Sequence, residues 1–109
     1  MAVRLVLCTA PDSPATRELV KTLVAERLVA CGNIVPAVTS IYRWQGAIEE
    51  AGEALIVFKT TEDAWPRLKE RVAQLHPYDV PELLLIGLDD GHAPYLNWVE
   101  ESTHPVSEV

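Results

Sequence analysis

The chain has 109 residues, enough for one domain with a single hydrophobic core and too few for two. Its apolar content of 49% excludes an intrinsically disordered chain. The 16 acidic residues outnumber the 9 Lys and Arg, and the resulting net charge of −7 argues against nucleic acid and anionic membranes as partners. Two cysteines cannot build a disulfide-dense secreted scaffold, and no stretch reaches the ~20 apolar residues of a spanning helix, so we expect a cytoplasmic protein.

The first part of the chain predicts a strand followed by a helix. Residues 3–9 are rich in apolar and β-branched side chains and stop before Pro11, which is typical of a strand. Ser13 followed by Pro14 is typical of a helix N-terminus. Apolar residues at helical spacing extend this helix to about Leu28.

The middle of the chain predicts a long β-hairpin. Residues 33–44 form the first arm, Gln45-Gly46 the turn, and the second arm ends at residues 59–60. Pro36 and Gly52 inside the arms indicate bulges or edge positions.

The last part predicts a helix, a strand and a short helix. The apolar stripe of residues 65–75 indicates a helix with Pro66 in its first turn and His76-Pro77 at its end. The candidates for its N-cap are Thr60, Thr61 and Asp63. Residues 83–88 form a continuous apolar run, which predicts a buried strand. A final helix runs from Pro94 to about Glu101.

The order β-α-β-β-α-β plus a C-terminal helix predicts an α+β, ferredoxin-like sandwich. Its four-stranded antiparallel sheet has the order 4-1-3-2, with helices on one face. We assign residues 1–102 to one domain and residues 103–109 to a loose C-terminal tail.

The long hairpin predicts self-association. Each arm has roughly a dozen residues and spans about 40 Å, so part of it must project beyond the sheet. Both faces of the first arm are substantially apolar, and an isolated two-stranded ribbon is marginal in water. Packing against copies of the same chain resolves this in a closed homo-oligomer, without choosing two copies over three. The alternative is that the C-terminal helix alone covers the ribbon.

A thiol, an imidazole and a carboxylate are predicted at one edge of the sheet. In this topology the end of the first strand meets the start of the last, which brings Cys8 near Glu82, and the second helix ends on the same side with His76. Such a set can bind Cu or Zn. The alternatives are that Cys8 is a small buried hydrophobe, that His76 caps carbonyls and that Glu82 makes an ion pair. We interpret Cys31 as structural, and His92 and His104 as exposed.

A second group of side chains is predicted on the hairpin and last helix: Lys59, Tyr95 and Trp98, with Tyr42 and Trp44. Core and subunit packing explains these residues in one interpretation. In the other, they form a small-molecule pocket between subunits.

Six blocks resemble the CutA family of divalent-cation-tolerance proteins, in family order and across nearly the whole chain. They are LCTAPD (7–12), ERLVACGNIVP (26–36), SIYRWQGAIEE (40–50), FKTT (58–61), LHPYDVPEL (75–83) and YLNWV (95–99). The resemblance implies a ferredoxin-like protomer and a homotrimer that exchanges its long hairpins. It also implies a link to divalent cations, copper especially, with Cys8, His76 and Glu82 at positions suggested for copper ligation. Some relatives carry a second histidine where this chain has Leu75.

Two functional hypotheses follow. The first is a metal-binding or metal-responsive homotrimer, whose divalent cation, such as Cu, is not needed for folding. The second is a trimeric signalling or scaffold protein resembling the PII-like proteins, with a small molecule in the inter-subunit cleft. A hydrolase or transferase is a weaker third idea, because no nucleophile–base motif is present, and we expect no enzyme.

Overall fold

A computed structural model describes residues 2–105, and residues 1 and 106–109 lie outside the described part. The elements are β1 (Val3–Ala10), α1 (Pro14–Ala25), β2 (Cys31–Trp44), β3 (Ala47–Thr61), α2 (Trp65–Leu75), β4 (Leu84–Gly87) and α3 (Ala93–Thr103). This confirms the predicted order of strands and helices. None of the described helices has the length and apolar character needed to cross a membrane.

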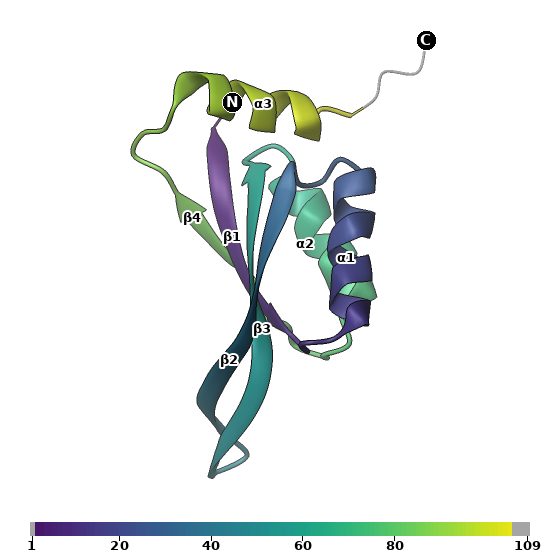
Figure 1. The fold of residues 1–109 in the computed structure, drawn as a ribbon, viewed down its shortest axis with the longest axis vertical. Coiled ribbons are helices and arrows are strands. Elements are labelled where there is room, and N and C mark those ends of the chain that lie inside the picture. Colours follow the sequence, from purple (N-terminus) through teal and green to yellow (C-terminus); the bar gives the residue numbers. More distant parts are fainter. Residues whose placement is uncertain (1, 106–109) are drawn as a thin grey trace.

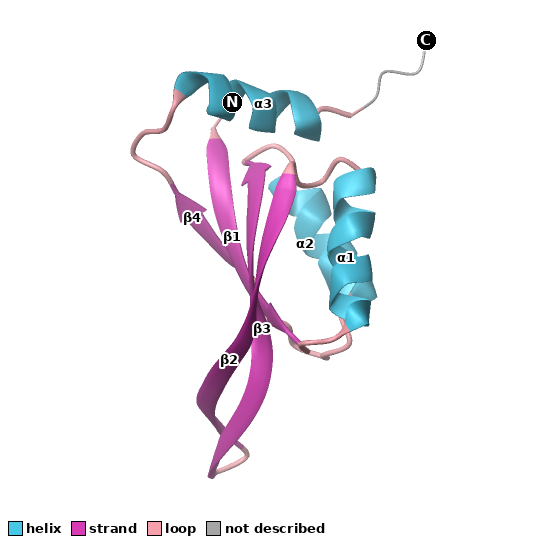
Figure 2. Cartoon of the chain, viewed as in Figure 1, coloured by secondary structure: helices cyan, strands magenta, loops and turns pink. Residues whose placement is uncertain are grey.

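The sheet has four antiparallel strands in the order β2-β3-β1-β4, which is the predicted order. Helices α1 and α2 lie together on one face (Figure 2). Helix α3 crosses one end of the sheet, where Val99 and Leu96 pack against Val3 and Ala30. The hairpin of β2 and β3 leaves the sheet at the opposite end.

The main core lies between the sheet and the two helices α1 and α2. Strand alternation turns Val6 and Cys8 of β1, and Ile56 and Phe58 of β3, toward the helices, and all four are fully buried. Gly32 lets α1 approach, because a Cβ at this position would lie 2.9 Å from Val20 Cγ1 and 3.0 Å from the Phe58 ring. Burying each large apolar side chain stabilises the fold by about 1.5–3 kcal/mol.

Helix α1 begins as predicted and ends earlier than predicted. Ser13 is its N-cap and Pro14 its first residue. The helix stops at Ala25 and does not reach Leu28, because Arg27 adopts a left-handed backbone with φ of 60°. The N–H groups of Arg27 and Leu28 donate to Val24 O and Leu23 O, and this pattern terminates a helix.

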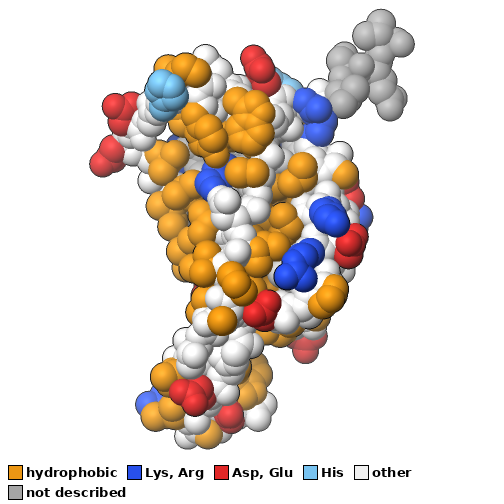
Figure 3. All heavy atoms as spheres, viewed as in Figure 1, with side chains coloured by type: hydrophobic (Ala, Val, Ile, Leu, Met, Phe, Trp, Pro, Cys, Tyr) orange, Lys and Arg blue, Asp and Glu red, His pale blue; other side chains and the backbone are white. Residues whose placement is uncertain are grey.

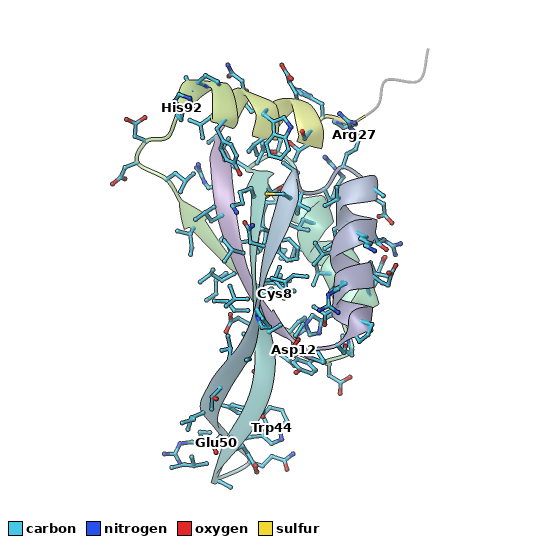
Figure 4. All side chains as sticks on the ribbon, in the orientation of Figure 1. Cys8, Asp12, Arg27, Trp44, Glu50 and His92 are labelled. Carbon is cyan, nitrogen blue, oxygen red and sulfur yellow. The ribbon has the colours of Figure 1, made fainter. Side chains whose placement is uncertain are left out.

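The Arg27 side chain stabilises the C-terminus of a second helix, α3. Its guanidinium donates to the carbonyl oxygens of Glu101 at 2.7 Å and His104 at 2.6 Å, at the C-terminus of α3 (Figure 4). These carbonyls have no partner within their own helix, so a cation there satisfies and stabilises them. Helix α3 extends to Thr103, the residue at which the tail is predicted to begin, and the Thr103 side chain is buried.

Two further expectations have mixed outcomes. Helix α2 has Pro66 in its first turn, as predicted, but its N-cap is Ala64 and none of the three predicted candidates. Thr61 Oγ1 accepts the N–H of Ala64 at 3.3 Å. The expected buried strand at residues 83–88 is wrong for the single chain. Strand β4 covers only Leu84–Gly87 and is exposed along its length, because it has one neighbouring strand and forms the edge of the sheet.

The hairpin projects beyond the sheet, as predicted. Pairing with β1 ends at Ala54, and beyond it the two arms pair only with each other. Gln45 and Gly46, with φ of 49° and 81°, form the tight turn that suits this strand twist. The expected bulge lies between Val35 and Val38, whereas Gly52 pairs in register.

An aspartate outside the hairpin stabilises the bulge. Within it, Ala37 has a left-handed backbone with φ of 59°. Its N–H donates to Asp12 Oδ2 at 3.1 Å, from the loop that follows β1. This hydrogen bond gives the unpaired amide of the bulge an acceptor and ties the root of the arm to the body of the molecule.

Candidate functional site

The candidate site lies where β1 ends, at the root of the hairpin. Cys8 is found at the point where the sheet narrows into the arm, with Asp12 in the loop before α1 and Trp44 and Glu50 farther out on the arm (Figure 4). A cavity of about 720 Å³ opens there between the arm and the loop that follows α2. Its lining residues are Thr9, Ser40, Ile41, Tyr42, Trp44, Glu53, Tyr78, Asp79, Val80 and Glu82.

The thiol of Cys8 is held in its protonated form. Cys8 faces the core, is fully buried and donates to Thr9 O at 3.5 Å. Burial, and then the nearby carboxylates of Glu82 and Glu53, raise the pKa of Cys8 to about 12. A metal ligand must be a thiolate, so Cys8 is not ready to ligate in this conformation.

Both ring nitrogens of His76 are in use. Nδ1 accepts the backbone N–H of Tyr78 at 3.1 Å, so the ring proton resides on Nε2, which donates to Thr9 O at 2.8 Å. The ring is buried and joins the end of α2 to the end of β1. The interpretation that His76 caps the carbonyls of a helix end is not borne out, because the carbonyl that its ring binds belongs to strand β1.

A buried carboxylate lies beside these residues. Glu53, on β3, is 7% exposed, and its Oε2 accepts the hydroxyl of Tyr78 at 2.8 Å. Burial, and then this hydrogen bond, raise the pKa of Tyr78 to about 12. The sequence analysis missed Glu53, because an acidic residue near Glu49 and Glu50 on a projecting arm gives the pattern of a solvated edge. Its place depends on the loop after α2, which no local pattern predicts.

The three predicted metal ligands are brought to one region. The carboxylate of Glu82 is close enough to act on the Cys8 thiol, and His76 binds the carbonyl next to Cys8. However, within residues 2–105 no group of three or more Cys, His, Asp or Glu side chains is arranged to hold a metal ion. With the thiol protonated and the imidazole nitrogens occupied, the three do not fit a metal as they stand in this subunit.

The structure does not bring Lys59, Tyr95 and Trp98, the second predicted group, into one pocket. The rings of Tyr95 and Trp98 pack at 5.5 Å between centroids, and Tyr95 Oη lies 3.8 Å from Cys31 Sγ. Lys59 is the cross-strand partner of Cys31. Trp98 lines a second cavity, of about 560 Å³, that neither Lys59 nor Tyr95 lines. His92 and His104 are exposed, as expected.

An apolar surface lies on the sheet face opposite α1 and α2. Leu5 and Leu7 of β1 point away from those helices by alternation and pair with Ile86 and Leu84 of β4. Leu84 is 53% exposed. Apolar side chains gather along this side of the molecule and again at the tip of the arm (Figure 3), where Ile48 is 72% exposed.

Comparison with known proteins shows that the sequence of this chain matches one protein family. Residues 4–102 match the family described as CutA1 divalent ion tolerance protein. The divalent-cation tolerance protein CutA of Thermus thermophilus is 52% identical over 98 residues, covering 90% of this chain and 95% of that protein.

Two solved structures share the fold. A structure of the divalent cation tolerance protein from Thermus thermophilus superposes with a TM-score of 0.90 at 50% identity, covering 94% of this chain and 99% of the other. The structure of the periplasmic divalent cation tolerance protein CutA from Archaeoglobus fulgidus gives a TM-score of 0.89 at 28% identity, with coverage of 94% and 99%.

Proposed function

This chain belongs to the CutA1 divalent ion tolerance family, and on that premise we propose that it is a homotrimeric divalent-cation-tolerance protein. It binds metal ions such as copper, contributes to the response to them, and is not an enzyme. The observation that carries the proposal is the match over residues 4–102, which includes the fold and the site region together.

The homotrimer is supported by two surfaces that one subunit leaves uncovered. The apolar sheet face around Leu84 and Ile86 and the projecting arm around Ile48 are exposed in the single chain. Contiguous apolar surfaces of this kind mark protein interfaces, and an open strand edge invites pairing. A ferredoxin-like protomer that exchanges its arm around a threefold axis buries both.

Sedimentation tests the oligomer directly. A trimer has about three times the mass of the 12.1 kDa chain, near 36 kDa. We expect this mass at micromolar concentration. A folded species of one or two subunits contradicts the proposal.

Cys8, His76 and Glu82 are the proposed metal ligands, and the structure sets a condition for their use. Cys8 must lose its proton, and His76 must release either Thr9 or the Tyr78 amide. Metal binding at these residues is therefore coupled to proton release and to the loss of one hydrogen bond of His76.

Calorimetric titration with copper and zinc salts tests this ligand set. Saturable binding is expected in the wild-type protein and is expected to weaken at least about tenfold in Cys8→Ala and His76→Ala. His92→Ala, which removes an exposed imidazole away from the site, is the matched control. Wild-type affinity in both site variants, with the oligomer intact, rules the ligand set out.

We place the protein in the cytoplasm. Both cysteines, Cys8 and Cys31, are free, which suits a reducing compartment. Fractionation of cells that express the full chain tests this location, and recovery with periplasmic markers contradicts it.

A small-molecule function in the manner of PII-like proteins is the alternative. It is favoured by the neighbouring rings of Tyr95 and Trp98, which are tilted by 41° and are 42% and 43% exposed. A thermal-shift screen with nucleotides and metabolites checks it. Ligand-dependent stabilisation that Trp98→Ala abolishes supports this function, and its absence counts against it.

A further inference from the structure

The cavity at the hairpin root is lined by acidic and aromatic side chains, and the proposed metal ligation involves none of the aromatic ones. Its charged lining residues are all carboxylates: Glu53, Asp79 and Glu82. Its aromatic lining residues are Tyr42, Trp44 and Tyr78. Among the described residues that line the cavity there is no Lys, Arg or His. An acidic cavity with aromatic walls is complementary to a cation that also has apolar surface.

The buried carboxylate of Glu53 has no cationic partner among the residues that the structure describes. Its hydrogen bond from Tyr78 occupies one of its two oxygens, whereas an ionised carboxylate offers about four acceptor positions. None of the ion pairs among residues 2–105 includes Glu53. Burying a carboxylate at 7% exposure without a nearby cation costs free energy, and a positively charged ligand in the cavity offsets that cost.

The three aromatic rings provide the second requirement. Tyr42, Trp44 and Tyr78 remain 44%, 55% and 38% exposed, so each has surface left for a ligand to cover. Tyr42 and Trp44 come from the projecting arm, and Tyr78 comes from the loop after α2, so the rings approach the cavity from two elements. Aromatic faces attract organic ammonium groups through the ring quadrupole. A bare metal ion gains little from such walls, and the volume of about 720 Å³ suits a small molecule.

We propose that this cavity binds a small organic cation, an alkylammonium or quaternary ammonium compound. The positive charge lies beside Glu53, and the alkyl groups contact Tyr42, Trp44 and Tyr78.

The site is compatible with the proposed trimer. Alternation along β2 places Tyr42 and Trp44 on one face of the arm. Arg43 and its cross-strand partner Ile48 lie on the other face. Ile41, which also lines the cavity, shares the face of Arg43 and Ile48. A neighbouring subunit that covers this face would therefore border the cavity at Ile41 and leave Tyr42 and Trp44 uncovered.

Calorimetric titration of the intact oligomer with tetramethylammonium chloride tests the proposal. The uncharged comparison compound is tert-butanol, which has nearly the same size, and sodium chloride controls for ionic strength. Saturable binding at one site per subunit is expected for tetramethylammonium, with tert-butanol at least about tenfold weaker.

Variants measure separately what the carboxylate and the aromatic rings contribute to the binding affinity. Glu53→Gln keeps a side chain that can bind the Tyr78 hydroxyl and is expected to weaken binding about tenfold, and Trp44→Leu about fivefold. Glu50→Gln is the matched control, because Glu50 lies on the same arm and does not line the cavity. Its affinity is expected to equal that of the wild type. Circular dichroism and sedimentation establish that each variant folds and assembles.

Several results would each overturn the proposal. They are no saturable binding of tetramethylammonium, equal binding of tert-butanol, or an unchanged affinity in both Glu53→Gln and Trp44→Leu. Binding of magnesium or copper ions alone, with no response to tetramethylammonium, also overturns it and assigns the cavity to metal ions. If Glu53→Gln fails to fold, Trp44→Leu decides, because its side chain is on the exposed arm.

Discussion

The two halves of strand β3 differ in their backbone pairing and in their surroundings. In the inner half, Ala54, Ile56 and Phe58 are fully buried, with β1 and β2 on either side and helices above. In the outer half, residues 47–50 are exposed and have only β2 beside them. The inner half is covered within one subunit, whereas the outer half is not. A single strand thus contributes both to the core and to the surface that we propose for subunit contacts.

The largest expected effect comes from a cavity in the inner half. Phe58→Ala removes a fully buried ring and is expected to lower the free energy of unfolding by about 3–5 kcal/mol. Urea denaturation at fixed protein concentration measures it, because the stability of an oligomer depends on concentration. Phe58→Leu should cost less. A loss in Phe58→Ala no larger than at a surface position would contradict the contrast between the halves.

A charge in the outer half is expected to break the assembly and not the fold. Ile48→Asp places a carboxylate on the part of the arm that we assign to subunit contacts and is expected to weaken association by about 2 kcal/mol per subunit. Sedimentation across a dilution series measures this, and Ile48→Val is the conservative control. If Ile48→Asp assembles as well as the wild type, Ile48 does not contact a neighbour.

The junction between the halves depends on a hydrogen bond to the bulge. Asp12→Ala leaves the Ala37 amide without its acceptor and is expected to cost about 1 kcal/mol. Hydrogen exchange should speed up in residues 38–53 and stay unchanged in the core strands. Asp12→Asn keeps an acceptor oxygen and should lose less. Equal exchange in wild type and Asp12→Ala argues that the bulge needs no anchor.

The smallest expected effect is a dependence of stability on pH, which comes from the buried thiol of Cys8. The folded protein holds the pKa of Cys8 near 12, against 9.0 for an ordinary thiol, so the unfolded chain releases this proton first. The stability that this thiol contributes is complete below pH 9 and decreases from there toward pH 12. By about pH 10 the loss is about 1 kcal/mol. Denaturation of wild type and Cys8→Ala at several pH values isolates this loss as their difference, and parallel curves would refute it.

The order of elements and the hairpin were predictable because their signals are local. Gln45-Gly46 between two β-rich runs specifies a turn, and Pro36 within a strand indicates a bulge. The end of α1 was not predictable, since Arg27 occupies a left-handed position that usually favours glycine.

Within the site, the meeting of Cys8 and Glu82 followed from topology. The hydrogen bonds of His76 and the burial of Glu53 depend on the path of the loop after α2. That path is a tertiary feature without a sequence signal of its own. The exposure of β4 likewise depends on a missing neighbour at the sheet edge, and an apolar run alone gives no information about it.

The hydrogen bonds that Arg27 donates to the end of α3 have a practical consequence for engineering. Helix α3 lies at one end of a molecule 51 Å long, and the turn of the arm lies at the other (Figure 1). A reporter protein or affinity handle appended beyond α3 would emerge far from both the arm and the cavity at its root. Probes attached there can report on the proposed subunit assembly and ligand binding without contacting the arm or the cavity.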